Sequence, residues 1–392
     1  MRSFILIAGL LLLFAVEFLR VYFIMPFPGS QHKDTLQFAY WLSNNIRWMR
    51  IVLVLVIAMP VITTLSTSIR WKRIVLFIVL IFYGVVFFLF NFRLQADKMF
   101  YQPSHKTLAT PEENKIALDK LVIGVVINGD ARAYPIQLIG YHHQVKDTVG
   151  NTPAIITYCT VCRTGRVYSP TVDGRLETFR LVGMDHFNAM FEDATTKSWW
   201  QQATGVAVAG PLKGATLKEF PSQQLTLGAW LRLYPSSLIM QPDSLYKKDY
   251  DDLADFDKGT VKSSLEKRDS ASWQNKSWVI GIQHEGVSKA YDWNALVKEK
   301  VLEDSVAGLP VLFVLEKDTA TFHAWNRRVD STVLNFEKNI SNETFRDKNT
   351  GSVWNMDGTC VDGNLKGKIL RPVQAYQEFW HSWKTFHPNT TR

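Results

Sequence analysis

One long segment of this chain occurs twice. Residues 121–235 recur imperfectly at 278–388, and the two stretches stay in register through many Gly, Pro and Trp positions. The offset is 157 residues at Gly124 and Gly281 and narrows to 153 where Trp230 faces Trp383. A chance match would not hold register for so long, so we predict two copies of one folding unit.

Comparing the copies also locates side chains that occur only once. Three reactive residues of the first copy face Glu or Thr in the second: His142, Cys159 and Cys162 against Glu299, Glu316 and Thr319. We therefore expect a common scaffold in both copies and a functional site in the first alone.

Three apolar segments near the N-terminus are long enough to cross a bilayer, which takes about 20 helical residues. They cover roughly 4–27, 51–69 and 74–92. Residues 1–94 hold nine Lys/Arg against two Asp/Glu, so seven of the eight net positive charges lie in this region. Membrane topology accounts for that charge, and nothing supports a nucleic-acid-binding face.

The connector 70–73 carries three cations in four residues and predicts a cytoplasmic position. The N-terminus would then lie inside, and the chain after Leu94 outside. Arg47 and Arg50 oppose this orientation. A cleaved signal peptide is the alternative for the first segment, but no small-residue cleavage site follows it.

The pattern predicts an all-α transmembrane region of three helices followed by an α+β, mostly β, soluble region built from two homologous repeats. The expected parts are a membrane anchor, a connector, the first repeat, a linker and a degenerate second repeat, at 1–94, 95–120, 121–240, 241–277 and 278–392.

Local patterns in the first repeat indicate strands. Residues 122–127 and 131–135 flank Asn128-Gly129, which suits a tight hairpin turn. A buried strand is expected at 154–158, a second hairpin around Asp173-Gly174, and a short helix over 225–234. The polar linker is expected to be a surface loop.

The run from Tyr158 to Gly165, with Cys159 and Cys162, is the sharpest local signal. Such a pair can chelate a metal, act as a redox dithiol or close a small disulfide. A thioredoxin-like dithiol needs its first cysteine at a helix N-terminus, whereas residues 163–169 indicate turn and strand. Only Cys360 remains as another thiol, which excludes a four-cysteine zinc site.

A histidine must therefore complete any metal site. His142 is the first candidate, with His143 and His186 as alternatives and Met184 or Met190 as a thioether ligand. This set suits copper ahead of zinc, because thiolate and thioether are soft ligands. A redox dithiol and a structural disulfide stay open as alternatives.

Six further residues are candidates to line the site, although several have a plainer structural interpretation: Arg132, Tyr134, Asp147, Tyr158, Asp193 and Trp200. Arg132 can enter the site or pair with Asp147, and we favour the pairing. Asp193 and Trp200 recur in the copy that lacks the cysteines, which favours a core role.

Several stretches resemble the bacterial domain of unknown function 3179 family. They are 129–135, His142 with Asp147, 158–162, 193–200, and Trp230 with Pro235. The resemblance spans most of 120–390 and implies a bacterial extracytoplasmic or membrane-tethered protein, with no established activity to carry over. Thr160-Val161 departs from the Pro-Leu that members tend to show, and three membrane helices stand where many have one export signal.

We therefore predict a protein of the bacterial inner membrane whose soluble region faces the periplasm. The first hypothesis is a copper or zinc site at Cys159, Cys162 and His142. A thiol–disulfide oxidoreductase and a non-catalytic binding or assembly protein with a structural disulfide are the alternatives, so enzymatic activity is left open. The expected partners are the lipid bilayer and a membrane or periplasmic protein, with no nucleic acid.

Overall fold

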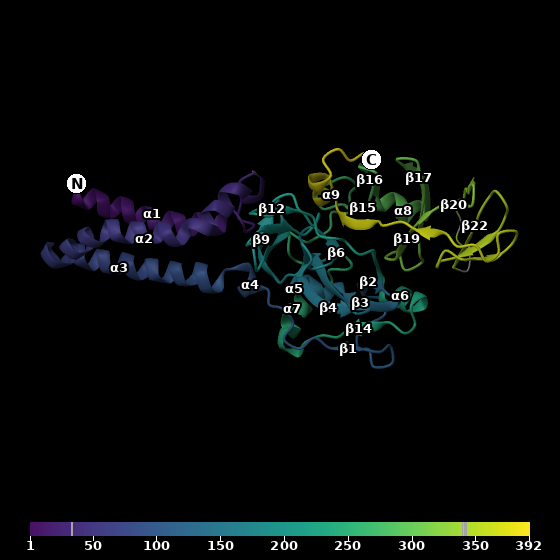
Figure 1. Ribbon diagram of the computed structural model, residues 1–392, viewed down its shortest axis with the longest axis horizontal. Helices are drawn as coiled ribbons and strands as arrows, with labels where there is room; N and C mark the ends of the chain where they lie inside the picture. The colour runs from purple at the N-terminus through teal and green to yellow at the C-terminus, as the bar shows by residue number, and fades with distance from the viewer. Residues whose placement is uncertain (33, 339, 341–342) are drawn as a thin grey trace. The chain divides into compact units, whose positions relative to one another are not determined.

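The computed structural model describes residues 1–32, 34–338, 340 and 343–392 (Figure 1). These residues fall into two compact units. The first unit consists of three segments, 1–101, 177–201 and 206–216; the second consists of 102–176, 202–205 and 217–392.

Three helices of the first unit are long and apolar enough to cross a membrane. They are α1 (Arg2–Tyr22), α2 (Leu36–Thr67) and α3 (Arg70–Phe88), the last continued by the π-helical turn η2 (Leu89–Arg93). The three predicted spans are thus confirmed as apolar helices, but α2 begins well before Ile51. Its added turns carry Arg50, whose Nε lies 2.6 Å from the buried carboxylate of Glu17.

Apolar contacts hold the three helices together. Leu6, Leu10 and Leu13 of α1 cluster with Ile57 of α2 and Leu76 of α3. Only 11% of the most apolar window of α2 and 6% of that of α3 is buried, so most of their surface is available to lipid.

The same unit contains a four-stranded sheet, which follows the order β12-β11-β10-β9. Its strands are β9 (Phe179–Asp185), β10 (Asn188–Asp193), β11 (Trp199–Gln201) and β12 (Ala207–Ala209). The sheet packs on the first turns of α2, where Trp199 meets Tyr40 edge-to-face at 5.1 Å.

The second unit begins with a mixed sheet of order β1-β14-β3-β2-β13. Its strands are β1 (Leu108–Ala109), β2 (Leu121–Ile127), β3 (Asp130–Pro135), β13 (Ser222–Thr226) and β14 (Leu238–Met240). The predicted β2–β3 hairpin is confirmed. Helix α6 (Leu227–Leu233) follows β13 and starts two residues later than expected, because 225–226 complete that strand.

Helix α5 (Ile136–His142) links this sheet to a three-stranded sheet of β4 (Gln144–Val149), β5 (Thr152–Cys159) and β6 (Thr164–Tyr168). The predicted strand at 154–158 is therefore part of β5. A small hairpin of β7 (Thr171–Val172) and β8 (Arg175–Leu176) turns at Asp173-Gly174 as expected, but Leu176 does not continue to Val182 as one strand.

The rest of the second unit repeats this element order. A sheet of β15 (Trp278–His284), β16 (Val287–Asp292) and β26 (Tyr376–Phe379) is linked by α8 (Trp293–Glu299) to the strands β17 (Val301–Val306), β18 (Leu309–Leu315), β19 (Phe322–Asn326) and β25 (Arg371–Pro372). Short strands and the last helix complete it: β20 (Arg328–Val329), β21 (Thr332–Val333), β22 (Thr344–Arg346), β23 (Val353–Asn355), β24 (Cys360–Asp362) and α9 (Trp380–Phe386).

A tryptophan packs against a strand backbone at two places, and this contact explains why glycine stands at both Gly124 and Gly281. A Cβ on Gly124 would lie 2.3 Å from the ring of Trp230, and one on Gly281 would lie 2.2 Å from the ring of Trp383. Each tryptophan therefore packs directly on the strand backbone, a contact that only glycine permits.

The linker 241–277 is not the simple surface loop that its polarity predicts. It forms η3 (Ser244–Tyr246) and α7 (Lys247–Asp252). Tyr250, Phe256 and Val261 in this segment are buried.

Candidate functional site

The two cysteines lie in the turn that joins β5 to β6. Cys159 ends β5 opposite Thr164, and Arg163 closes the turn with a left-handed φ of 57°. This confirms the predicted strand–turn–strand setting. Both thiols are fully buried, and no disulfide occurs among the cysteines of the described residues.

Segments far along the chain enclose this turn. The Nζ of Lys276 donates to the carbonyl of Val161 at 2.7 Å, and the N–H of Phe379 donates to the carbonyl of Cys162 at 3.0 Å. The cysteine turn is thus held by Lys276, which precedes β15, and by Phe379 at the end of β26.

His381, at the start of α9, is the imidazole beside the cysteines. Its Nε2 lies 3.9 Å from the Sγ of Cys162, and its Nδ1 lies 3.0 Å from the carbonyl of Asn275. Because a carbonyl only accepts, Nδ1 carries the proton and Nε2 presents its lone pair toward the thiol. Burial lowers the pKa of His381 to about 3, so the ring is neutral.

Burial also controls the charge of the neighbouring groups. It raises the pKa of Cys162 well above its ordinary value, and the adjacent Cys159 adds to this effect. Burial lowers the pKa of Lys276, while the two cysteines act in the opposite direction. A thiolate and an ammonium at this site would therefore stabilise one another.

Two buried arginines fix the strand that leaves the turn. Arg163 stacks on Trp278 at 3.9 Å and donates to Gln377 at 2.9 Å. Arg166 pairs with the buried carboxylate of Glu378 at 2.5 Å. Because both acceptors lie on β26, the position of His381, which follows that strand, is tied to the position of the cysteines.

The side chain of His142 contacts two tyrosines. Its Nε2 lies 2.6 Å from the hydroxyl of Tyr250, and its ring meets Tyr246 edge-to-face. The Nδ1 of His143 lies 3.1 Å from the carbonyl of Tyr141. No group of three or more His, Cys, Asp or Glu arranged to hold a metal is found in the described part of the chain. His142 as a ligand stays a prediction.

Met184, His186, Met190, Asp193 and Trp200 belong to the first unit. His186 pairs with Asp185 at 2.6 Å. The carboxylate of Asp193 accepts from the indole N–H of Trp200 at 2.9 Å, and Asp347 accepts from Trp354 at 3.1 Å in the same way. This recurrence supports a structural role for Asp193 and Trp200.

Arg132, Tyr134 and Asp147 form one polar cluster. Tyr134 donates to Asp147 at 2.6 Å, whereas Arg132 pairs with Asp130 at 2.8 Å and approaches Asp147 at 3.7 Å. The favoured pairing of Arg132 with Asp147 is therefore secondary to the one with Asp130.

Tyr158, the last of the predicted lining residues, lies on β5 directly before Cys159. Its ring meets Phe256 edge-to-face at 5.8 Å, and its buried hydroxyl has no hydrogen-bond partner among the described residues.

His381 and Lys276 were not among the predicted site residues. His381 falls opposite Gly228 at the offset of 153, so it is an imidazole that occurs in the segment 278–388 and has no counterpart in 121–235. Lys276 precedes the matching segment, and no sequence signal marks it.

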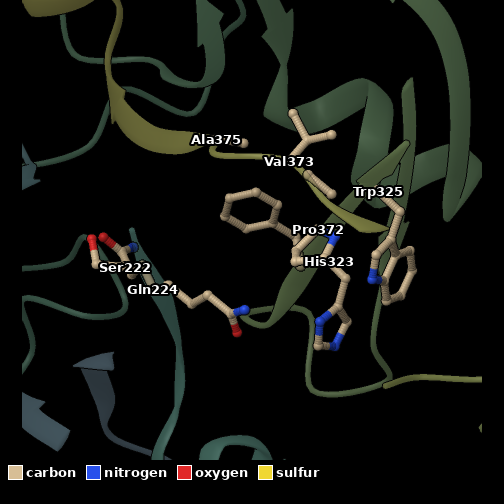
Figure 2. A pocket seen from close by; sticks show the side chains of 10 residues that line it. Ser222, Gln224, His323, Trp325, Pro372, Val373 and Ala375 are labelled. Atoms are coloured by element: carbon tan, nitrogen blue, oxygen red, sulfur yellow. The ribbon is translucent and has the colours of Figure 1, made fainter. Parts of the chain in front are cut away.

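Residues of β13, β19 and β25 line a small pocket with about 40 Å³ of free volume (Figure 2). His323 on β19 faces Gln224 of β13 across it, and Trp325 stacks on His323. The Nε2 of His323 lies 2.8 Å from the carboxylate of Glu316, the residue that stands opposite Cys159. A carboxylate hydrogen-bonded to an imidazole thus lies where the first segment has the thiol of Cys159.

The chain belongs to the family described as protein of unknown function (DUF3179), whose model matches residues 101–390. The predicted resemblance is therefore confirmed. Neither the curated proteins nor the solved structures include a match to this chain.

Proposed function

We propose that this is a membrane-anchored metal-binding protein whose centre consists of Cys159, Cys162 and His381. The observation that carries the proposal is the lone pair of His381 Nε2, directed toward Cys162 at 3.9 Å while Nδ1 is tied to a carbonyl. A histidine that ligates a metal ordinarily donates its other ring N–H in this way.

Cys162 Sγ and His381 Nε2 are close enough to bind one ion between them. Sulfur and nitrogen ligands of one tetrahedral zinc lie about 3.5 Å apart, given bond lengths of about 2.3 and 2.0 Å. The observed separation is a few tenths of an ångström larger, so a small side-chain rotation of His381 brings both atoms to bonding distance.

Charge favours copper(I) ahead of zinc. Two thiolates around a monovalent ion carry one net negative charge, whereas two around a divalent ion carry none. The buried ammonium of Lys276 would offset the negative charge of the copper(I) centre. Beside a neutral zinc centre the same ammonium would have no opposite charge. Thiolates are also the ligands that copper(I) prefers.

We further propose that the two similar halves are copies of one ancestral unit and that the second supplies the ligand which the first lacks. The shared element order and the paired Trp–Gly contacts support common ancestry. The three apolar helices and the cationic connector at 70–73 support an inner-membrane anchor with the metal centre on the periplasmic side.

A competition titration of the purified full chain with a chromophoric copper(I) chelator tests the metal proposal. We expect one equivalent of copper(I), and affinity at least about tenfold lower in Cys162→Ser and His381→Gln, because each loses a ligand. Cys360→Ser is the matched control, since Cys360 lies in another core cluster, and should bind as the unmodified chain does.

His142→Gln separates the two histidine assignments in the same titration. Unchanged affinity favours His381 as the ligand, and a loss confined to His142→Gln favours the sequence-based set. Absence of copper(I) and zinc binding in the unmodified chain would overturn the proposal.

A thiol–disulfide oxidoreductase is the second candidate, favoured by the adjacency of the two thiols. Complete burial and the raised pKa of Cys162 oppose it, because exchange needs an accessible thiolate. Rapid alkylation of Cys162 in the folded, metal-free protein would support this candidate over the metal site.

A further inference from the structure

A second small pocket lies wholly within the first unit, where the apolar helices give way to polar residues. It holds about 60 Å³ of free volume, enough for a group larger than one water molecule. Its cations are Arg20, near the end of α1, and Arg180 of β9. Ser43 and Gln95 add a hydroxyl and an amide.

Among the described residues, Arg20 makes no ion pair with a carboxylate. Both oxygens of Glu17 are taken by Arg50, each at 2.6 Å. Arg20 Nη2 instead donates to the carbonyl of Phe90 at 2.8 Å and to the side chain of Asn91 at 2.9 Å. These neutral acceptors leave a guanidinium with capacity for an anion.

One donor of this guanidinium is unused. Arg20 Nε is buried and has no hydrogen-bond partner among the described residues. An unsatisfied buried donor of a charged group is unfavourable, so such atoms ordinarily meet a ligand or water. Because Arg20 lines the pocket, this unused donor favours a bound acceptor there.

Arg180 is a more exposed and partly paired cation. Its Nη2 lies 2.9 Å from Glu192, and its Nη1 lies 3.7 Å from Asp97. Its Nε also lies 2.9 Å from Glu192, so the buried carboxylate of Glu192 is paired with Nε and Nη2. At 3.7 Å from Asp97, Nη1 makes no short hydrogen bond there, so it can donate to an anion while the pair with Glu192 is kept. The two guanidinium groups can therefore act together on one oxyanion.

The rest of the pocket wall is apolar, which distinguishes the site from a simple phosphate site. Val21, Ile24, Met25, Leu94 and Val182 line it. Position matters as well, because Arg20 lies close to the end of an apolar helix, at the level where lipid headgroups begin. A ligand with an anionic head and hydrocarbon chains fits both features.

We propose that this pocket binds the phosphate group of a membrane glycerophospholipid, with Arg20 and Arg180 as its donors. The lipid would fasten the end of α1 to β9, both of which belong to the first unit. This site is independent of the cysteines and of any metal.

The test measures thermal stabilisation of the detergent-purified full chain by three added probes: dioleoyl phosphatidylglycerol, dioleoylglycerol and inorganic phosphate. We expect a concentration-dependent rise of Tm with the phospholipid alone. An equal rise with dioleoylglycerol would overturn a role for the phosphate, and an equal rise with inorganic phosphate would overturn a role for the lipid.

Substitutions of the two arginines test whether the phospholipid stabilises the protein at this pocket. Arg20→Gln and Arg180→Gln should each raise the phospholipid concentration for half-maximal stabilisation roughly tenfold, the usual effect of losing a charged hydrogen bond. Arg70→Gln, at the other end of the helices, should leave it unchanged. If Arg20→Gln fails to fold, Arg180→Gln still decides the test, because Arg180 is half-exposed. An unchanged response to the phospholipid in Arg180→Gln would contradict the proposal.

Discussion

At the scale of single residues, burial sets the protonation of His387, the residue that caps the C-terminal end of α9. His387 stacks on Trp383 with ring centroids 3.8 Å apart, and its Nδ1 donates to the carbonyl of Trp383 at 3.1 Å. Burial lowers the pKa of His387 below its ordinary value of 6.5. The folded protein therefore keeps this ring neutral at a pH where the unfolded chain already takes up a proton.

The consequence is a measurable pH dependence. The stabilisation from neutral His387 is complete above pH 6.5 and is lost as the pH falls from there through the lower folded pKa. His387→Phe keeps a stacked ring and removes the titration. We expect its Tm to fall less than that of the unmodified chain between pH 7 and pH 5; parallel decreases would contradict this assignment.

At the scale of elements, two strand–helix pairs are joined by a tryptophan that packs on a glycine: Trp230 on Gly124 and Trp383 on Gly281. Gly281 lies in β15, and Trp383 in α9, the helix that also carries His381. The strand and the helix can approach so closely only because the glycine has no side chain. The contact therefore positions the imidazole as well as the fold.

Gly281→Ala tests this contact. An added Cβ would meet the Trp383 ring at 2.2 Å and force α9 outward, at a cost of about 1–3 kcal/mol. We expect a lower Tm together with weaker copper(I) binding, because His381 moves with the helix. Gly84→Ala in α3 is the control: apart from the helix's own nearby backbone, no described atom lies within 4 Å of the added carbon, so the substitution should not lower the Tm and should leave copper(I) binding unchanged.

At the scale of the whole molecule, the sequence predicted what local patterns encode. The apolar helices, the hairpin at Asn128-Gly129 and the cysteine turn all follow from runs of a few residues or one helix length. His381 could not be found in this way, because 219 positions separate it from Cys162 along the chain. Contacts of that range depend on how strands pair, which a single sequence does not specify.

Local sequence patterns also could not predict which segments belong to which of the two compact units. Residues 177–201 and 206–216 pack with the apolar helices, although they lie between strands of the second unit. The local sequence around Phe179 and Leu181 does not specify the surface on which the sheet of β9 to β12 lies. The buried part of the linker was missed for a related reason, since isolated aromatic residues in a charged segment show no periodicity.

The most direct test of the metal centre is copper K-edge X-ray absorption of the copper(I)-loaded full chain. The account predicts a first shell of two sulfur atoms and one nitrogen atom, with the nitrogen lost in His381→Gln and the shell unchanged in Cys360→Ser. A first shell without sulfur, or one that keeps its nitrogen in His381→Gln, would contradict the account.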